Sequence, residues 1–328
     1  MSRLLLRRLP AALGVILAGS VIVFTLLRLI PGDPAASLAG PDAPPEAVAA
    51  LRDRLGLDEP PVSQYLHWAG GLLTGHLGDS LVLGGSVASL LGAAVGNTVL
   101  LTAAALVLAV GLAMVFAVGP ELMRGPVARR RAREIATAFS SVSVAVPNFV
   151  TGTVALIVFG VLVAVLPAGG VPRDGLLADP LITAQYLLLP AVCLALPVAA
   201  TLTRYLSDAV AAELCLPYVT TARATGQSRR TTVLTQVLPN ALPPTITVLG
   251  LQVGQLLGGA VIIEVLFAWP GLGYLAQQAV TQRDYPVVQV LLVASVVVFV
   301  ILQTLTDLAH AALDPRIRLT PAPAGAPA

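Results

Sequence analysis

Long apolar runs constrain this chain more than any other feature of its sequence. A helix needs about 20 consecutive apolar residues to cross the hydrocarbon core of a bilayer. Only 11% of the 328 residues are charged, against roughly a quarter in an ordinary soluble protein. The sequence therefore predicts an all-α membrane protein with about six transmembrane helices, at approximately Leu9–Ile30, Val95–Val118, Ile135–Leu166, Gln185–Leu206, Ile246–Ala268 and Val287–Ala309.

Prolines interrupt two of these runs. Proline lacks a backbone donor and its ring clashes with the preceding turn of a helix. We expect Pro147 to kink the third helix or to mark the end of its cytoplasmic part. Pro190 and Pro197 are expected to act in the same way in the fourth helix.

The distribution of arginine predicts the orientation, because short cytoplasmic loops are rich in basic residues. Arginines precede the first run, follow the last, and occupy two loops between, at Arg3, Arg7, Arg8, Arg124, Arg129, Arg130, Arg131, Arg133, Arg223, Arg229, Arg230, Arg316 and Arg318. The opposite loops contain more acidic residues than arginines: Asp33, Asp42, Glu46, Asp53, Asp58, Glu59, Asp79, Asp174, Asp179 and Asp284. We therefore expect both termini to be cytoplasmic.

A signal peptide is the competing interpretation of the first run, since a basic start precedes an apolar stretch. The length of the run, Arg28 near its far end and the following "PGDP" favour a membrane span.

The chain is expected to divide into four segments. Residues 1–30 form an N-terminal transmembrane helix, 31–93 an extracytoplasmic cap, 94–310 a core transmembrane domain with the five remaining helices, and 311–328 a cytoplasmic tail. The cap contains two helix-like pieces, "PPEAVAALRDRLGL" and "PPVSQYLHWAGGLL". The tail ends in the proline-rich, low-complexity "TPAPAGAPA".

A polar stretch between the fourth and fifth runs, "YVTTARATGQSRRTTVLTQVLPNALPP", predicts an elbow of two helices on the cytoplasmic face. Pro217 suits the first position of a short helix and Gly226 the residue just past its end. A second helix is expected to begin after Ser228 as N-cap and to stop before Pro239. An ordinary loop whose arginines obey the charge rule remains the alternative, whereas three arginines beside a bilayer make a poor nucleic-acid footprint.

Three residues near the outer ends of the spans are candidates for the membrane path. Glu264 is an acid within an apolar run, a position that normally faces protein or a watery cavity. It lines the path or an outer gate, or it is a structural lock paired with an arginine or a backbone group. Trp269 is either an interfacial anchor or part of a loop beside the gate. Asn97 lies in the second run.

Small residues recur four apart in the fifth run, at Gly250, Gly254 and Gly258, with Gly259 adjacent. Such spacing permits close helix packing. It serves an interface with a second membrane subunit or a tight contact within the chain equally well.

The sequence contains no motif that indicates an enzyme. We find no phosphate-binding GxxxxGK[ST] loop, no paired carboxylates and no nucleophile with a base. Cys193 and Cys215 lack ligand spacing, so no metal or cofactor is expected in this chain. A secondary transporter or channel is the other transport class, but inverted repeats, a coupled-ion site and a selectivity ring are not evident.

The order and spacing of Ala222, Gly226, Leu238 and Pro239 resemble the signature of the integral-membrane subunits of bacterial ABC importers. "YVTTARATG", "NALPPTITVLGLQVGQLLGGAVIIEVLFAWPGLG", "RDYPVVQ" and "LDPRIR" are similar to the dipeptide and oligopeptide permease branch of that family. The N-terminal "LLRRLPAALGVILAGSVIVFTLLRLIPGDPA" and "LGLDEPPVSQYLHWAGGLLTGHLGDS" extend the resemblance to most of the chain.

The resemblance implies a type I ABC importer transmembrane fold and a machine of several subunits. This chain would pair with a homologous permease to enclose a path for peptides in the bacterial cell membrane. Cytoplasmic ATPase subunits would bind ATP and Mg²⁺, and an extracytoplasmic solute-binding protein would deliver substrate. Relatives of this branch also carry nickel chelates, glutathione or haem.

The resemblance also assigns the elbow as the coupling helix on which the ATPase docks. The residues implied are Tyr218, Thr220, Thr221, Ala222, Arg223, Ala224 and Gly226, followed by Leu238 and Pro239 in the loop after it. Thr220 stands where the family has a glutamate, Thr221 replaces an alanine, and Gln236 replaces an isoleucine. We therefore expect docking through the shape of a small-residue helix and the sharp exit at Gly226, without the family's charge pair.

Overall fold

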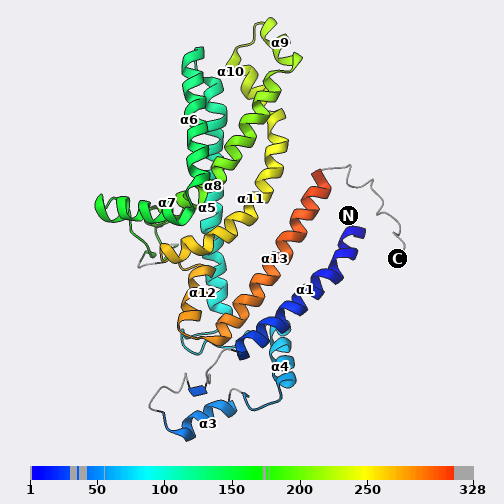
Figure 1. Cartoon of the computed structure of the whole chain (residues 1–328), viewed down its shortest axis with the longest axis vertical. Coiled ribbons are helices and arrows are strands. Elements are labelled where there is room, and N and C mark those ends of the chain that lie inside the picture. Colours follow the sequence, from blue (N-terminus) through cyan, green and yellow to red (C-terminus); the bar gives the residue numbers. More distant parts are fainter. Residues whose placement is uncertain are drawn as a thin grey trace. The chain divides into compact units, whose positions relative to one another are not determined.

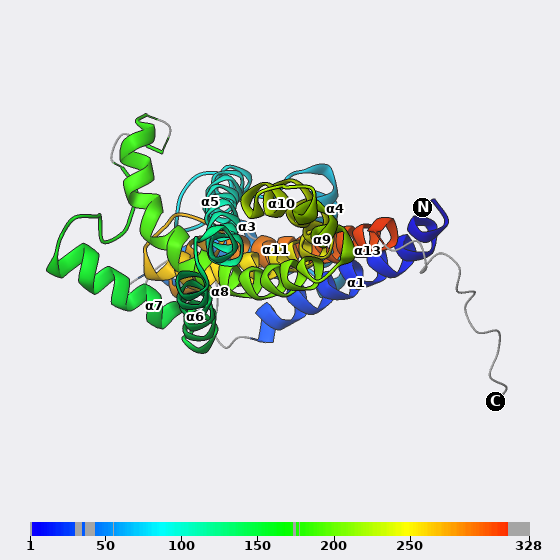
Figure 2. The same ribbon diagram turned by 90° about the horizontal axis from the view of Figure 1, so that it is seen from above.

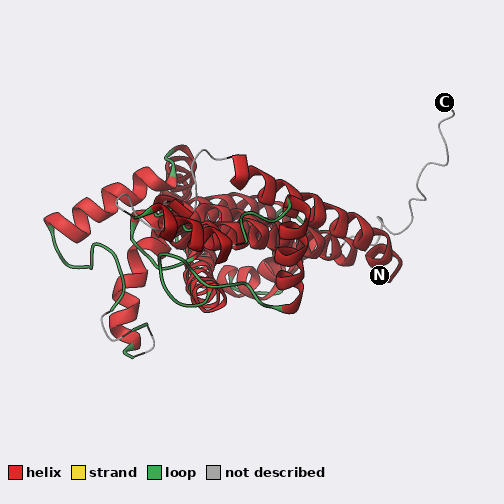
Figure 3. Ribbon diagram, turned by 90° about the horizontal axis from the view of Figure 1, so that it is seen from below, coloured by secondary structure: helices red, strands yellow, loops and turns green. Residues whose placement is uncertain are grey.

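The computed structural model describes residues 2–29, 35–36, 43–54, 56–172, 175–176 and 178–313. Helices and loops make up this part of the chain, with one isolated bridge between Asp79 and Ser86 (Figure 3). The predicted all-α fold is confirmed. The chain separates into two compact units, one built on Met1–Gly96 with Tyr274–Leu308 and the other on Asn97–Gly273.

The first unit contains α1 (Ser2–Leu29), α3 (Pro45–Arg54), α4 (Pro61–Thr74) and most of α13 (Tyr285–Leu313). The two helix-like pieces predicted in the cap are therefore present as α3 and α4. An aromatic cluster of Phe24, Tyr65 and Trp68 packs α4 on α1, with ring centroids 5.4 to 6.0 Å apart. The cap residues 31–34, 37–42 and 55, with Asp33 and Asp42 among them, lie outside the described residues, as do Arg173, Asp174 and the tail from 314.

The second unit contains most of α5 (Val87–Leu122), then α6 (Pro126–Ala145), α7 (Asn148–Ala155), the π-helical η1 (Leu156–Leu162), α8 (Pro180–Leu214), α9 (Pro217–Ala224), α10 (Arg229–Thr232), the π-helical η2 (Val233–Val237) and α11 (Leu238–Leu266). Helix α12 (Leu272–Thr281) begins at its end. Helices α5, α6, α8 and α11 lie side by side, as both views show, and α9 with α10 lies at one end of them (Figures 1 and 2).

Small residues allow these helices to approach closely. Ala105, Ala109 and Ala113 recur every fourth position of α5 and are fully or almost fully buried. They form one core cluster with α8 and α11, whose buried members include Leu194 and Ala260. At the α9 end, a second cluster joins α5, α8, α9 and η2.

Pro147 interrupts the third apolar run, as predicted. Helix α6 ends at Ala145, Pro147 precedes α7 with φ −56° and ψ 141°, and the two helical parts meet at an angle of 102°. Figure 1 shows α7 leaving the bundle sideways.

Pro190 and Pro197 do not end α8, which runs unbroken from Pro180 to Leu214. The expectation that either proline ends the helix was therefore wrong, and the alternative of a kink stays a prediction. Both prolines lie within the packed bundle, and the Thr201 hydroxyl donates a hydrogen bond to the Pro197 carbonyl at 3.0 Å. Prolines are tolerated inside membrane helices where neighbouring helices surround the backbone.

The six predicted runs all fall largely on helices. Helices α5, α8 and the stretch Arg229–Leu266 are each long and apolar enough to cross a membrane. The apolar parts of α1 and α13 with described side chains are shorter, Pro10–Leu26 and Tyr285–Ile301, and the third run is the bent pair. The number of spans and the four-segment division remain predictions.

Candidate functional site

The predicted first helix of the elbow is present as α9. Pro217 occupies its first position, after Leu216 in an extended conformation. Gly226 has φ +86°, its N–H donates to the Arg223 carbonyl at 3.0 Å, and the Gln227 N–H donates to the Ala222 carbonyl at 3.1 Å. This pair of hydrogen bonds is a Schellman motif, which requires the left-handed conformation that glycine adopts most easily.

Helix α9 has one face held by the protein and one face exposed. Val219 and Ala222 are 1% and 7% exposed, and Val219 belongs to the second core cluster, together with Ala117 and Val118 of α5. The outward residues are Thr220, Thr221, Arg223 and Ala224. Core contacts therefore hold this short helix, which would be marginal alone in water.

Tyr218, at the start of α9, is half-buried and points back to α8. Its hydroxyl donates a hydrogen bond to the Glu213 carboxylate at 2.6 Å. Burial raises the pKa of the Tyr218 hydroxyl above its ordinary value, and the hydrogen bond to Glu213 raises it further. Of the residues assigned to docking, Tyr218 and Ala222 thus face inward.

The second half of the elbow begins as predicted and continues differently. The Ser228 hydroxyl caps α10 by accepting the Thr231 N–H at 3.2 Å. The expected stop before Pro239 was wrong, because η2 passes directly into α11 and Arg229–Leu266 forms one continuous helical stretch. The π-helical turn widens the helix just before the proline, and such turns accommodate irregular hydrogen bonding. Leu238 is half-buried against the second core cluster, whereas Pro239 is exposed.

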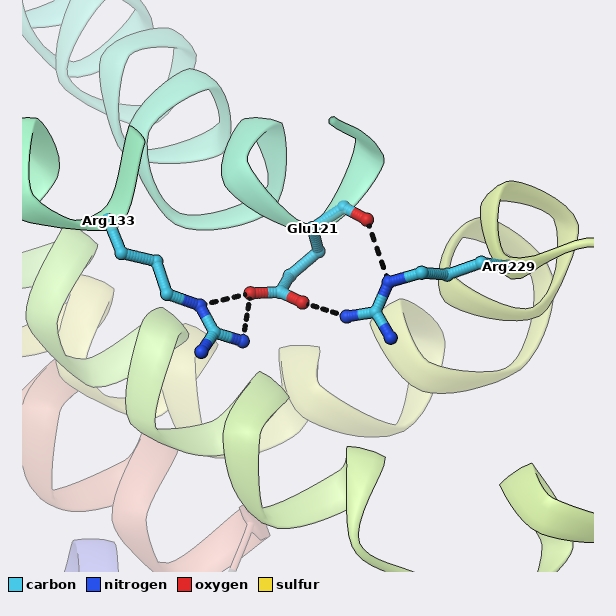
Figure 4. Close-up of polar contacts among 3 residues, drawn as sticks. All are labelled: Glu121, Arg133 and Arg229. Carbon is cyan, nitrogen blue, oxygen red and sulfur yellow. Dashed lines mark hydrogen bonds and ion pairs between the residues drawn. The ribbon is translucent and has the colours of Figure 1, made fainter. Parts of the chain in front are cut away.

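One buried carboxylate beside the elbow escaped the sequence analysis. Glu121 lies in the last turn of α5 and is 4% exposed. It forms ion pairs with Arg133 of α6 and Arg229 of α10, which approach it from opposite sides (Figure 4). Both arginines were identified only as cytoplasmic charges.

The structure brings Asn97, Glu264 and Trp269 together at the other end of α11. The Glu264 carboxylate is fully buried and accepts hydrogen bonds from the Thr98 hydroxyl and the Gly273 N–H, each at 2.6 Å. The Trp269 indole N–H donates to the Asn97 carbonyl at 2.9 Å, and the Asn97 amide donates to the Pro270 carbonyl at 2.9 Å. These bonds tie α5 to the turn between α11 and α12.

Close approach in this turn depends on Gly271. A Cβ atom at this position would collide with the Glu264 carboxylate. Trp269 is fully buried, so the interfacial-anchor interpretation does not fit its position. The contacts of Glu264 match the backbone-paired lock that the sequence analysis weighed against a path role.

A further buried carboxylate, Asp284, lies in the first unit. It accepts hydrogen bonds from the Ser80 hydroxyl at 2.5 Å and from the N–H groups of Leu81, Val82 and Leu83 at 3.4, 3.1 and 3.2 Å. Burial alone raises the pKa of the Asp284 carboxyl, but the four hydrogen bonds outweigh burial and hold the pKa below its usual value. The loop before α5 is fastened to the start of α13 in this way.

No three His, Cys, Asp or Glu side chains gather to hold a metal ion within the ranges that the structure describes.

Comparisons with known proteins agree along most of the chain. The family model for binding-protein-dependent transport system inner membrane components matches residues 122–319, and the model for the N-terminal part of such components matches residues 1–108. The chain is 35% identical over 314 residues to a probable peptide ABC transporter permease of Sinorhizobium fredii, covering 96% of this chain and 98% of that protein.

Two further relatives extend the comparison. A putative peptide permease of Brucella ovis is 36% identical over 326 residues, covering 98% of this chain and 100% of the relative. A glutathione transport system permease of Escherichia coli is 33% identical over 313 residues, covering 95% of this chain and 98% of the relative.

Proposed function

The chain belongs to the family of binding-protein-dependent transport system inner membrane components, and we propose that it forms, with a homologous second permease, the membrane path of an ATP-driven importer of di- and oligopeptides. Its membership and its apolar helices make it a multi-pass protein of the cell membrane with a transport role. ATP and Mg²⁺ bind to separate ATPase subunits, and an extracytoplasmic solute-binding protein delivers the peptide.

The observation that carries the proposal is the two-sided elbow. Helix α9 rests on its own core through Val219 and Ala222, and it presents Thr220, Arg223 and Ala224 outward. An ATPase that binds this face can displace α9 together with the ends of α5 and α8, because all three share one cluster. Nucleotide binding can then shift the bundle between two states, as alternating access requires.

The arginines near the elbow support a proposed orientation. The starts of α6 and α10 lie at the same end of the bundle as α9 and carry several arginines, as expected of a cytoplasmic face. We place both termini on that face and the turn around Glu264 on the outer face. Glu264, Trp269 and Asn97 then form a fixed outer wall next to the path.

The partner permease has a candidate contact on α11. Gly250, Gly254 and Gly258 lie exposed on this helix, with open space where a Cβ would stand, while Gly259 faces Asn148 and Leu194. Of the two interpretations of this stripe, the second-subunit interface therefore suits the first three glycines.

The peptide substrate rests on the names of relatives that cover nearly the whole chain. A glutathione importer is the second candidate, because one relative is a glutathione permease. Glutathione is itself a modified tripeptide, so the two candidates share a chemical class.

The test uses purified transporter in liposomes, with candidate ATPase subunits from the same organism. Ala224→Trp places a large ring on the outward face of α9, and Ala128→Trp makes the same change at an exposed alanine of α6. We expect the first to lower ATPase co-purification and substrate-stimulated ATP hydrolysis by about tenfold or more, equivalent to about 1.4 kcal/mol of binding. The second should leave both near wild type.

Uptake of radiolabelled trialanine and of glutathione, each with its binding protein, separates the two substrates. A wild-type protein that retains no ATPase and takes up solute only with a proton gradient would instead be a secondary transporter.

A further inference from the structure

Glu121 joins three elements that meet at the elbow. The Arg133 Nε–H of α6 donates to Glu121 Oε1 at 2.7 Å. Arg229, the first residue of α10, binds Glu121 Oε2 and also donates from Nε to the Glu121 main-chain carbonyl at 3.2 Å. The last turn of α5 is thereby linked to α6 on one side and to α10 on the other (Figure 4).

The link between Glu121 and the two arginines is partly shielded from water. The Glu121 side chain is 5% exposed, and the side chains of Arg229 and Arg133 are 26% and 54% exposed. Charged hydrogen bonds to a guanidinium are directional and among the strongest in proteins. Without the carboxylate, two guanidinium groups would face one another across a partly buried gap, so the charged link that joins α6 and α10 to α5 depends on Glu121.

The link lies directly behind the docking surface. Only the turn Thr225–Ser228 separates α9 from Arg229. Val219 of α9 belongs to one apolar cluster with Ala117 and Val118 of α5, about one turn before Glu121. Apolar contacts are non-directional, so they allow packed helices to slide past one another. The two hydrogen bonds from Arg229 to Glu121 instead fix the position of α10 relative to α5.

We propose that Glu121 is a positioning residue for transport, which makes α10 follow α5 and so carries the movement of α9 into α5, α6 and α11. The proposal rests on the proposed function, since it assigns the transmission step of the same elbow. Arg229 is the contact that carries movement from the elbow, because η2 and α11 continue from α10 without a break. Arg133 holds the other side of the carboxylate and keeps α6 in register.

If Glu121 only stabilised the assembled protein, its loss would give a different result from the loss of a positioning residue. Loss of a purely stabilising residue lowers the amount of assembled transporter. ATP hydrolysis and uptake then both fall in proportion to that amount. Loss of a positioning residue leaves ATPase docking on α9 intact, because the outward face of α9 does not include Glu121. ATP is then hydrolysed with little transport.

The experiment measures ATP hydrolysis and trialanine uptake in the same liposomes, with the full transporter and its binding protein. Glu121→Gln keeps the size of the side chain and removes its charge. We expect hydrolysis within about twofold of wild type and uptake per ATP about tenfold lower, which is within the range of ordinary coupling between sites. Glu134→Gln is the matched control, because Glu134 pairs with Arg130 on the exposed side of α6 and is 60% exposed.

A second pair of variants keeps the test decisive if Glu121→Gln does not assemble. Arg229→Gln removes the α10 contact and retains the Glu121–Arg133 pair, so it should lower uptake per ATP strongly. Arg133→Gln retains the α10 contact and should lower it less. Unchanged uptake per ATP in Arg229→Gln, or equal effects of the two arginine variants, would overturn the proposal. Failure of the wild type to bind an ATPase would instead refute the proposed function.

Discussion

Two buried glutamates occupy opposite ends of the second unit and are held in different ways. Glu121 is held by long guanidinium side chains from two other helices. Glu264 accepts hydrogen bonds from a short threonine side chain and from the backbone of a tight turn. Long side chains can follow a helix that moves, whereas backbone donors in a glycine turn cannot. The comparison indicates an elbow end whose helices can move together as a linked group, and a rigid end around Glu264.

The rigid end should show the largest loss of stability. Glu264→Gln retains the shape of the side chain but replaces one acceptor oxygen with a donor group, facing either the Thr98 hydroxyl or the Gly273 N–H. A buried polar group left unsatisfied costs about 1–3 kcal/mol. We expect the thermal unfolding midpoint of the lipid-embedded transporter to fall accordingly, while uptake per ATP in the surviving protein stays near wild type.

Gly271→Ala tests the same point without a substitution at Glu264 itself. The new Cβ would displace the Glu264 side chain and should destabilise the transporter to a similar extent. Gly111→Ala is the matched control, because Gly111 of α5 is exposed and a Cβ there would meet no atom within 4 Å. If Glu264→Gln abolished uptake at unchanged stability, Glu264 would line the path and the outer end would not be a passive wall.

Local signals in the sequence predicted much of this arrangement. Pro217, Gly226 and Ser228 each mark a helix terminus through their own backbone or side-chain chemistry, and the structure has all three termini. Pro147 breaks its run in the same local way. Such features need no knowledge of what packs against them.

Features that depend on neighbours were missed or mistaken. Pro197 and Pro239 look like Pro147 in the sequence, but packing and a π-helical turn let the helix continue through them. Glu121 stands among arginines at the end of an apolar run, and the count of charges does not tell which arginine reaches it. Trp269 looks like an interfacial residue until the turn around it closes.

Asp284 is a third buried carboxylate, and its contribution to stability should depend on pH. The hydrogen bonds that hold the pKa of Asp284 below its usual value stabilise the fold most when the carboxyl is ionised. That contribution is fully present above the ordinary aspartate pKa, about 4, and is lost as the pH falls through the lower, folded value. Asp284→Asn should therefore destabilise the protein by about 1–2 kcal/mol at neutral pH, and the difference from wild type should shrink in strong acid.

Unfolding midpoints of wild type and Asp284→Asn, measured across this range, check the sign. Asp79→Asn is the control, because Asp79 lies exposed just before the same loop. A difference that grows on acidification would mean that the carboxyl is protonated in the folded protein.

The smallest change in stability is expected for an arginine–glutamate ion pair that is exposed to solvent. Arg130 and Glu134 form an ion pair one turn apart on α6, at 2.9 Å, with side chains 84% and 60% exposed. Exposed pairs of this spacing contribute about 0.3–0.5 kcal/mol, and salt screens them further. Arg130→Gln should therefore shift the unfolding midpoint hardly at all, whereas Arg229→Gln removes a partner from a buried carboxylate and should shift it clearly. Equal shifts for the two variants would mean that burial of Glu121 does not set its importance, and the distinction between the two ends of the bundle would then lose its physical basis.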